Sequence, residues 1–438
     1  MGLTRVIAIF AVTVSLFTFV AFFGRLPTFR NTPIGFCHRL FVIHIPSGLR
    51  RLDVGLTGGR ITEGSSRLGH YLMNEKHPVV VIFFLALITI SVALFVPTVW
   101  HLLPVQHKFL VPLIVPLPYL FTYLSATRNS QAYITPFNHA AQMRQYPYDR
   151  ILYYPGNTCQ TCRFLKPARS KHCSICKTCV ARCDHHCVWV NNCLGRGNYK
   201  WFLALLLSTS IMLAYGAYLA YITLTPKVNK NYAKFEKWYR YQPGPDANPE
   251  GWGTFFDKKL HYLSIYAGIY IEQGGAAGAG VGLLALLTWP LPLGLLAYQT
   301  YLIYAGMTTN ESSKWADWRD DMLDGIVFLA KRRENTFQNN RFHTPTYAHS
   351  HASSSSGTPI DTPPETPPEI EEPPTTWPLE SRHVLIRTTN GQPPTRLPPR
   401  IQSVVADKES FERVWDLGKV ENVYDLGFWD NLLNLLRD

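Results

Sequence analysis

The chain has 438 residues, of which 47% are hydrophobic and only 16% are charged, and its formal net charge at pH 7 is +12. Long uncharged apolar runs alternate with polar, proline-rich stretches, which excludes both a simple soluble globular protein and a wholly disordered one. The positive charge suits nucleic acid or an anionic membrane face, but the apolar runs favour the membrane, and we expect no nucleic-acid partner.

Five apolar runs are long enough to cross a bilayer as helices, which takes about 20 residues. They cover residues 6–23, 79–99, 109–124, 201–224 and 278–304. The first is interpreted as an uncleaved anchor rather than a signal peptide, because it is long and no small-residue cleavage site follows it. The second and third are close enough to form a hairpin, and Pro112, Pro116 and Pro118 should bend the third.

The spans divide the chain into segments with different expected structures. We expect a membrane anchor over 1–24, a loop over 25–77, a transmembrane hairpin over 78–125, a cysteine-rich domain over 126–200, a membrane helix over 201–224, a loop over 225–277, a membrane helix over 278–305, a short region over 306–340, a disordered linker over 341–403 and a C-terminal segment over 404–438. The linker is rich in Pro, Ser and Thr, a composition that cannot bury a core. The more apolar end beyond it should dock on the membrane domain.

Basic residues predict the orientation, because loops rich in Lys and Arg stay on the cytosolic side of a membrane. Segments 25–77 and 126–200 are both rich in Arg and Lys, so we expect both to be cytosolic. Five spans then place the 225–277 loop in the lumen and the C-terminal tail in the cytosol. The 225–277 loop is itself fairly basic, which argues mildly against this topology, although long loops weigh less in the rule.

Eight of the nine cysteines lie between Cys159 and Cys193, and the ninth is Cys37. Within this stretch, cysteines separated by two residues alternate with histidines, and such pairs can hold one tetrahedral zinc ion. Two zinc sites need eight ligands, whereas the stretch offers eight cysteines together with His172, His185 and His186. Three candidate ligands are therefore surplus. A disulfide framework is the alternative, but disulfides are rare in the cytosol.

A surplus cysteine beside a surplus histidine and a carboxylate provides a nucleophile, a base and an orienting group. The run Asp184-His185-His186-Cys187 offers this combination within four residues. A free thiol has a pKa of about 8.5 and is only slightly ionised near neutrality, so a neighbouring imidazole raises its reactive fraction. A membrane-anchored zinc-binding interaction module is the competing interpretation. It explains the cysteines and the spans, but it leaves the surplus residues without a purpose.

The run at Asp184 to Cys187 resembles the DHHC protein S-acyltransferases, or palmitoyltransferases. The similarity continues through residues 189–199, and Thr308 to Glu311 resembles the family's TTxE motif. Residues 422–427 with Asn431 look like its C-terminal PaCCT motif, without the aromatic-glycine pair that often closes it. The five-span outline is similar to the fungal branch that resides in the endoplasmic reticulum and acylates SNAREs.

The resemblance supports an all-α polytopic membrane protein with about five transmembrane helices and a small cytosolic double-zinc domain. It implies one zinc site made of Cys159, Cys162, His172 and Cys179, and another made of Cys173, Cys176, His186 and Cys193. Cys187 would then be the nucleophile, His185 its base and Asp184 the orienting carboxylate, with Cys183 a passive residue. The supporting residues would be Thr309, Glu311 and Asn431. Thr309 would hydrogen-bond near Asp184, although Thr309 and Glu311 are alternatively helix caps, and Asn431 is alternatively a surface residue.

The resemblance also implies the reaction partners and the location. The donor would be a long-chain acyl-CoA such as palmitoyl-CoA, and the acceptors would be juxtamembrane cysteines of membrane proteins, SNAREs included. The enzyme would be a multi-pass protein of the endoplasmic reticulum membrane, with two zinc ions in a structural role. Basic residues are candidates for binding the CoA phosphates, although such charges are ordinarily solvated; they are Arg163, Lys166, Arg169, Lys171 and Arg182.

Overall fold

The computed structural model describes residues 17, 20, 32–127, 132–242, 252–333, 373–397, 399–402, 404–406 and 411–437. The anchor expected over 6–23 lies outside these residues, apart from positions 17 and 20. So do residues 334–340 of the expected 306–340 region and residues 341–372 of the expected linker. The chain forms two compact units. One contains Met1–Leu113 and Ile211–Trp289, and the other contains Ile114–Ser210 and Pro290–Asp438.

Four helical stretches of the described residues are long and apolar enough to cross a membrane. They are Val79–Trp100, Val105–Thr127, Tyr199–Tyr239 and Trp252–Tyr304. Only 11% of the apolar window in the first is buried within the protein, as expected where lipid covers the side chains. The expectation of a mostly helical, multi-pass membrane protein is confirmed.

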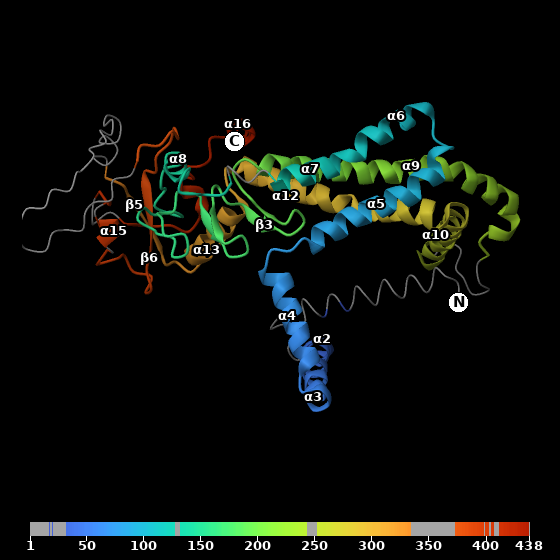
Figure 1. Ribbon diagram of the computed structural model, residues 1–438, viewed down its shortest axis with the longest axis horizontal. Helices are drawn as coiled ribbons and strands as arrows, with labels where there is room; N and C mark the ends of the chain where they lie inside the picture. Colours follow the sequence, from blue (N-terminus) through green and yellow to red (C-terminus); the bar gives the residue numbers. More distant parts are fainter. Residues whose placement is uncertain are drawn as a thin grey trace, which may run out of the picture. The chain divides into compact units, whose positions relative to one another are not determined.

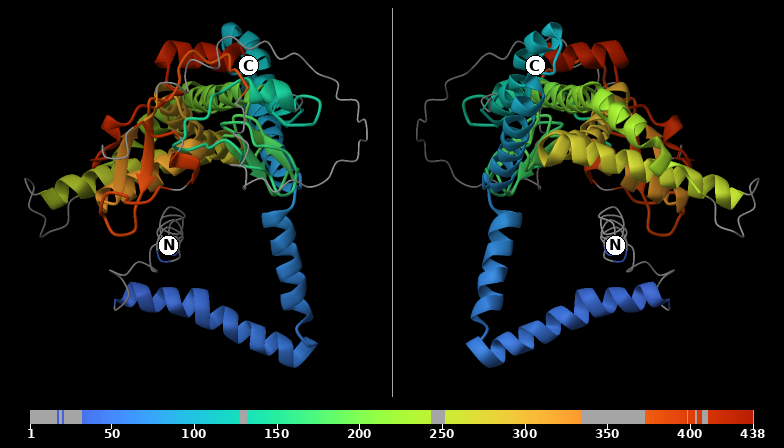
Figure 2. Two further views of the ribbon diagram at one scale, coloured as in Figure 1. Left: turned by 90° about the vertical axis from the view of Figure 1, so that its left-hand side faces the viewer. Right: turned by 90° about the vertical axis from the view of Figure 1, so that its right-hand side faces the viewer.

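The first unit contains helices only, as far as its residues are described. It comprises α2 (Pro33–His38), η2 (Arg39–His44), α3 (Ile45–Thr57), α4 (Arg60–Asn74), the span α5 (Val79–Trp100), most of α6 (Val105–Ile114), the later part of α9 (Tyr199–Tyr239), α10 (Trp252–Gly275), η3 (Ala276–Gly280) and α11 (Val281–Thr288). Helices α3 and α4 meet at a corner (Figure 2). The 25–77 region, expected as a loop, is therefore helical over most of its described length.

The loop expected over 225–277 is a second correction, because most of its described residues are helical. Helix α9 continues past Pro226 to Tyr239, and α10 begins at Trp252. The two helices pack through aromatic side chains, with the rings of Tyr232 and Tyr266 stacked at 4.9 Å. Most of the described basic residues of this region therefore lie on helices, and aromatic contacts join the two helices.

The second unit combines the cysteine-rich stretch, three membrane-helix segments and a small sheet. Its elements are α7 (Pro116–Thr127), α8 (His139–Met143), β1 (Lys171–Cys173), β2 (Thr178–Val180), β3 (His185–Cys187), β4 (Asn192–Leu194), the start of α9, α12 (Pro290–Tyr304), α13 (Thr309–Leu323), β5 (Val327–Lys331), β6 (His383–Arg387), α15 (Pro399–Gln402), β7 (Glu412–Arg413), η4 (Leu417–Lys419) and α16 (Phe428–Arg437). A break at residue 115, just before Pro116, separates α6 from α7, so the expected proline bend is confirmed.

The disordered linker expected over 341–403 is wrong in its later part, where β6 belongs to a three-stranded sheet of order β6-β5-β7. Strand β6 pairs antiparallel with β5, with Leu385 opposite Leu329 (Figure 1). Val384, Leu385 and Ile386 are almost fully buried. The surrounding Pro and Thr residues masked a short apolar run that is typical of a strand.

The carbonyl end of α12 is closed by side chains from distant parts of the same unit. The last carbonyl groups of a helix have no partner within it. Asn431 on α16 donates to the carbonyl of Ile303 at 3.0 Å, and Asn422 donates to that of Ala305 at 3.0 Å. Arg169 donates to the carbonyl of Gly306 at 3.2 Å. The C-terminal segment is thus docked, and Asn431, only 4% exposed, is not a surface residue.

The close approach at Gly306 gives a test of this docking. Gly306 has a φ of +63°, and a Cβ atom there would lie 2.5 Å from the Cα atom of Asp425 in the tail. Gly306→Ala should therefore lower the free energy of unfolding by about 1–3 kcal/mol, the usual cost of a strained backbone, measured as a lower thermal midpoint in detergent. Gly294→Ala on α12 is the matched control, because its Cβ atom would meet nothing within 4 Å. Equal midpoints for the two variants would contradict the tight docking.

Candidate active site

The cysteine-rich stretch forms two small β-hairpins that each present one histidine beside one cysteine. In the first hairpin, β1 pairs with β2 so that His172 lies opposite Cys179. In the second, β3 pairs with β4 so that His186 lies opposite Cys193. Directly opposed residues of an antiparallel pair project to the same face, so each hairpin holds two candidate metal ligands together.

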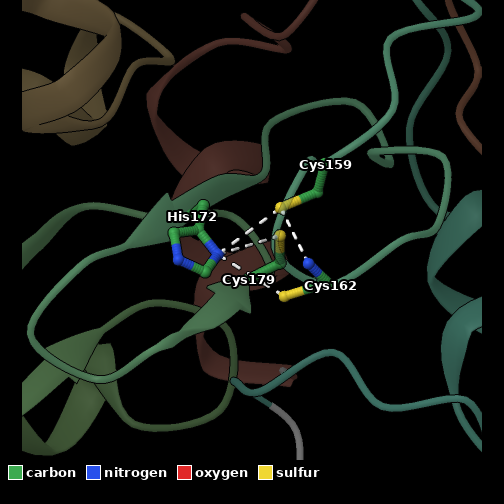
Figure 3. Close-up of side chains that lie close together, drawn as sticks. All are labelled: Cys159, Cys162, His172 and Cys179. Carbon is green, nitrogen blue, oxygen red and sulfur yellow. Dashed lines mark hydrogen bonds between the residues drawn. The ribbon is translucent and has the colours of Figure 1, made fainter.

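Each of these pairs meets the thiols of a Cys-x2-Cys turn. The ligand atoms lie within 4.8 Å of one another in both sets, which are Cys159, Cys162, His172 and Cys179 (Figure 3), and Cys173, Cys176, His186 and Cys193. The Sγ atom of Cys162 lies 3.4 Å from Nδ1 of His172, close to the separation of about 3.5 Å that tetrahedral Zn–S and Zn–N bonds impose. Both sets fit zinc, with four protein ligands and hence no open position. The grouping is the one that the family resemblance implied.

A 14-residue repeat in the sequence relates the two ligand sets. Adding 14 to positions 159, 162, 172 and 179 gives 173, 176, 186 and 193. The residue after each Cys-x2-Cys pair, Arg163 or Lys177, has a positive φ of 62° or 55°. Asn191, a further 14 residues along, has a φ of 50°, so Cys187 begins a third turn in which Val190 replaces the second cysteine. This repeat is a signal that could have chosen the ligand partition from the sequence alone.

Strand β3 separates the candidate catalytic residues from the metal ligands. Successive side chains of a strand point to opposite faces, so His186 faces the metal set while His185 and Cys187 share the other face. The Nδ1 atom of His185 lies 2.6 Å from Oδ2 of Asp184, and His185 also hydrogen-bonds Cys187. Asp184 and Cys187 are buried. The three surplus residues of the sequence are therefore brought together.

The surroundings raise the pKa of both His185 and Cys183, with different consequences for their reactivity. Burial alone would lower the pKa of His185, but hydrogen bonds with Asp184 and Cys187 raise it to about 9. An imidazole with a pKa above neutrality holds the proton that it takes from Cys187, which favours an imidazolium beside the Cys187 sulfur. Burial, helped by the nearby Asp184 carboxylate, raises the pKa of Cys183 to about 12. Cys183 therefore stays a thiol, and a thiol is a poor nucleophile.

The first turn of α13 holds the carboxylate of Asp184. The backbone N–H of Thr309 donates to Oδ1 at 2.7 Å, and its hydroxyl donates to Oδ2 at 2.9 Å. A helix N-terminus favours an anion. The capping box of this helix is made by Thr308 and Glu311. Thr308, not Thr309, is thus the cap, and Thr309 is left to bind Asp184.

Two further residues extend this hydrogen-bond chain into the membrane helices. Gln299 on α12 donates from Nε2 to the Thr309 hydroxyl at 3.4 Å, and the Tyr199 hydroxyl donates to Gln299 Oε1 at 2.5 Å. Each group in this chain can donate to the next, and the chain ends on the Asp184 carboxylate, which only accepts. Sequence reasoning missed Gln299, although a buried amide in an apolar span is a functional signal.

Glu311 reaches back into the cysteine-rich stretch, where it pairs with Arg169. The Nη2–Oε2 distance is 2.6 Å and the Nε–Oε1 distance is 2.8 Å, so the pair is bidentate, and both side chains are at most 2% exposed. The rings of Tyr146 and Tyr424 lie 5.0 and 4.5 Å from the guanidinium carbon. The expectation that Arg169 meets the CoA phosphates is wrong, because its guanidinium is buried and already paired.

Known proteins resemble this chain over nearly its whole length. Residues 153–316 match the family described as DHHC palmitoyltransferase. The chain is 41% identical to Palmitoyltransferase SWF1 of Neurospora crassa, over 99% of this chain and 92% of that protein. It is 39% identical to Palmitoyltransferase swf1 of Emericella nidulans, over 99% and 97%. It is 34% identical to Palmitoyltransferase swf1 of Schizosaccharomyces pombe, over 69% and 78%.

Adjacent histidines on β3 allow a test of the metal partition. His186→Ala removes one ligand of the second set, so we expect zinc content to fall from about two ions to about one per chain, with loss of stability, because structural zinc contributes to folding. His185→Ala should keep both ions. Elemental analysis of the purified variants measures the difference, and equal zinc loss in the two variants would rule out this partition.

The hydrogen-bond chain predicts that Gln299 positions Asp184 through Thr309. Gln299→Leu should slow alkylation of Cys187 by iodoacetamide by about ten-fold, the effect of losing one hydrogen bond of about 1.4 kcal/mol. Gln299→His should restore the rate, because a neutral imidazole has one donor and one acceptor nitrogen. Peptide mass spectrometry measures the rates. Thr300→Val is the control, since the Thr300 hydroxyl donates to the carbonyl of Leu296 in its own helix and, among the described residues, is not part of the chain that reaches Asp184. Similar slowing in Gln299→Leu and Thr300→Val would argue against the chain.

Proposed function

This chain belongs to the DHHC palmitoyltransferase family and is a protein S-acyltransferase, and from that premise we propose that it works through an acyl-enzyme thioester on Cys187. The proposed reaction moves a long acyl chain from acyl-CoA to a cysteine of a membrane protein. The arrangement on β3 carries the proposal: His185 and Cys187 share a face, and Oδ2 of Asp184 lies 2.6 Å from Nδ1 of His185.

In the first half-reaction His185 accepts the thiol proton of Cys187, and the sulfur attacks the carbonyl carbon of the acyl-CoA thioester. The bond between that carbon and the CoA sulfur breaks. The CoA thiolate leaves and takes the proton from His185. Asp184, held by Thr309, keeps the imidazole oriented and stabilises the imidazolium form that exists between the two proton transfers.

In the second half-reaction the substrate cysteine replaces CoA. His185 accepts the proton of the substrate thiol, the substrate sulfur attacks the acyl-enzyme carbonyl, and Cys187 leaves and recovers the proton. One thioester is exchanged for another, so the reaction needs no oxidant and no separate energy source. The eight metal-binding residues would hold two structural zinc ions, which supply rigidity to the two hairpins.

The surroundings of the site support an acyl-CoA donor and membrane-bound acceptors. A fatty chain lodged among the membrane helices would gain about 0.8 kcal/mol per buried CH₂ group. Arg163, Lys166, Lys171 and Arg182 remain candidates for contacts with the CoA phosphates. The basic segments 25–77 and 126–200 favour a cytosolic catalytic stretch and tail. Residence in the endoplasmic reticulum and SNAREs as substrates rest on the family resemblance.

The proposed intermediate is tested by labelling with an alkyne fatty acid. We expect hydroxylamine-sensitive label on Cys187 that disappears in Cys187→Ala, while that variant keeps its zinc because Cys187 is not a metal ligand. Cys183→Ala is the matched control, since it removes a buried thiol four residues away and should keep the label. Label that persists in Cys187→Ala and maps to Cys183 would overturn the assignment.

The position of the nucleophile predicts which cysteines are acylated. Cys187 lies twelve residues before Tyr199, where the membrane-crossing helix α9 begins, so its thioester cannot be carried far from the interface. Moving a substrate cysteine outward in steps from the end of its transmembrane helix should make acylation fall steeply, because tethering sets the effective concentration. Acyl exchange on purified substrate measures the effect. Undiminished acylation of a cysteine on a distant soluble domain would refute this proximity rule.

A further inference from the structure

Helices α3 and α4 carry narrow apolar stripes on their outer faces. On α3 every member is three or four positions from the next, as one face of a helix requires, and the members are Ile45, Leu49, Leu52 and Leu56. On α4 the corresponding residues are Ile61, Leu68 and Leu72. These seven residues are called the corner stripe below.

Most of the corner stripe is open to its surroundings. Leu56 is 83% exposed, Ile61 is 65% exposed, and Leu49 and Leu52 are each 61% exposed. Single exposed apolar side chains are ordinary on a protein surface, but a contiguous row of them marks an interface. The stripe therefore needs a partner that is itself apolar.

The corner between the two helices is fixed by two glycines with positive φ and by hydrogen bonds to one carboxylate. Gly58 and Gly59 both have a positive φ, of 70° and 88°, and reverse the chain there. The carboxylate of Asp53 on α3 then accepts hydrogen bonds from the backbone N–H of Ile61 at 3.3 Å and of Thr62 at 2.7 Å. It thus caps the start of α4, which has no side-chain cap at Gly59. These hydrogen bonds tie the end of α3 to the start of α4 at the corner.

A short connector ties this corner to the membrane. Helix α4 ends at Asn74 and the span α5 begins at Val79. Between them His77 is buried, with Nε2 2.7 Å from the carbonyl oxygen of Leu72 and its ring 5.3 Å from that of Tyr71. Because the connector is short and held at His77, the start of the span keeps the end of α4 near the bilayer surface.

Arginines accompany the stripe on its polar flanks. Arg50 and Arg51 on α3, and Arg60 and Arg67 on α4, are all exposed. Their positions in the helical repeat put Arg50 and Arg51 off the stripe, where long side chains can reach headgroup phosphates while their stems cover apolar surface. An apolar stripe with basic flanks, next to a membrane span, is complementary to an anionic leaflet.

We propose that α3 and α4 lie in the interface of the same membrane that the spans cross. The corner stripe then inserts among the acyl chains, and the arginines contact the phosphates of anionic phospholipids. This surface is separate from the proposed acyl-transfer chemistry, and its test does not depend on activity.

The test uses the full-length chain in nanodiscs of phosphatidylcholine and phosphatidylserine, with Cys37→Ser as background. An environment-sensitive fluorophore is attached at Leu56→Cys or Leu68→Cys on the stripe, and at Gly55→Cys or Ser66→Cys off it. Gly55 offers open space for the new side chain. We expect blue-shifted emission and quenching by spin-labelled lipid at the two stripe positions, and neither at the two others. The label on the parent chain gives the background from other thiols.

Two results would overturn the proposal. Equal lipid quenching on and off the stripe would show that the stripe does not insert preferentially into the membrane. Blue-shifted emission without lipid quenching would show that protein, such as a second copy of the chain, covers it. A separate variant tests the arginines. Arg50→Gln with Arg51→Gln should reduce quenching at Leu56→Cys in nanodiscs that contain phosphatidylserine. Unchanged quenching would show that the arginines do not bind anionic lipid and would contradict that part of the proposal.

Discussion

The buried ion pair between Arg169 and Glu311 is the contact on which the arrangement of the active site depends. Burial alone would raise the pKa of Glu311, but the guanidinium of Arg169 lowers it, so the carboxylate stays charged. Removing one member of a buried pair costs about 3–5 kcal/mol, because the other charge is left without a partner. Arg169 also binds the end of α12 at Gly306 and lies against Tyr424 of the tail. Three segments far apart in the sequence, around residues 169, 306–311 and 424, are therefore held in place together.

The ion pair affects the position of Asp184 through the first turn of α13. Thr309 and Glu311 both belong to the start of α13, so the ion pair that fixes Glu311 also fixes the two donors that Thr309 offers to Asp184. From the other side, the metal set fixes His186, and the strand geometry then determines where His185 and Cys187 point. Strand β3 positions His185 and Cys187, and helix α13 positions Asp184, so both elements are needed to orient the catalytic residues.

Much of the site could be predicted from the sequence, because its signals are local. Ligand spacing, the surplus count and the run at Asp184 to Cys187 all lie within 35 residues, and apolar runs of membrane length located four described spans. The predictions failed where long-range contacts decide. Arg169 was taken for a solvated charge because its partner is 142 positions away, and β6 was hidden by its proline-rich neighbours until β5 paired with it.

The shared strand of metal ligand and nucleophile also determines how the enzyme can be switched off. Thiolates that bind zinc, as Cys173 and Cys193 would in the second metal set, can be attacked by peroxide or by electrophiles. Loss of the metal would free His186, and β3 would no longer hold His185 and Cys187 in one orientation. Oxidative stress could therefore silence acyl transfer without touching the nucleophile, and a reductant together with fresh zinc would restore it.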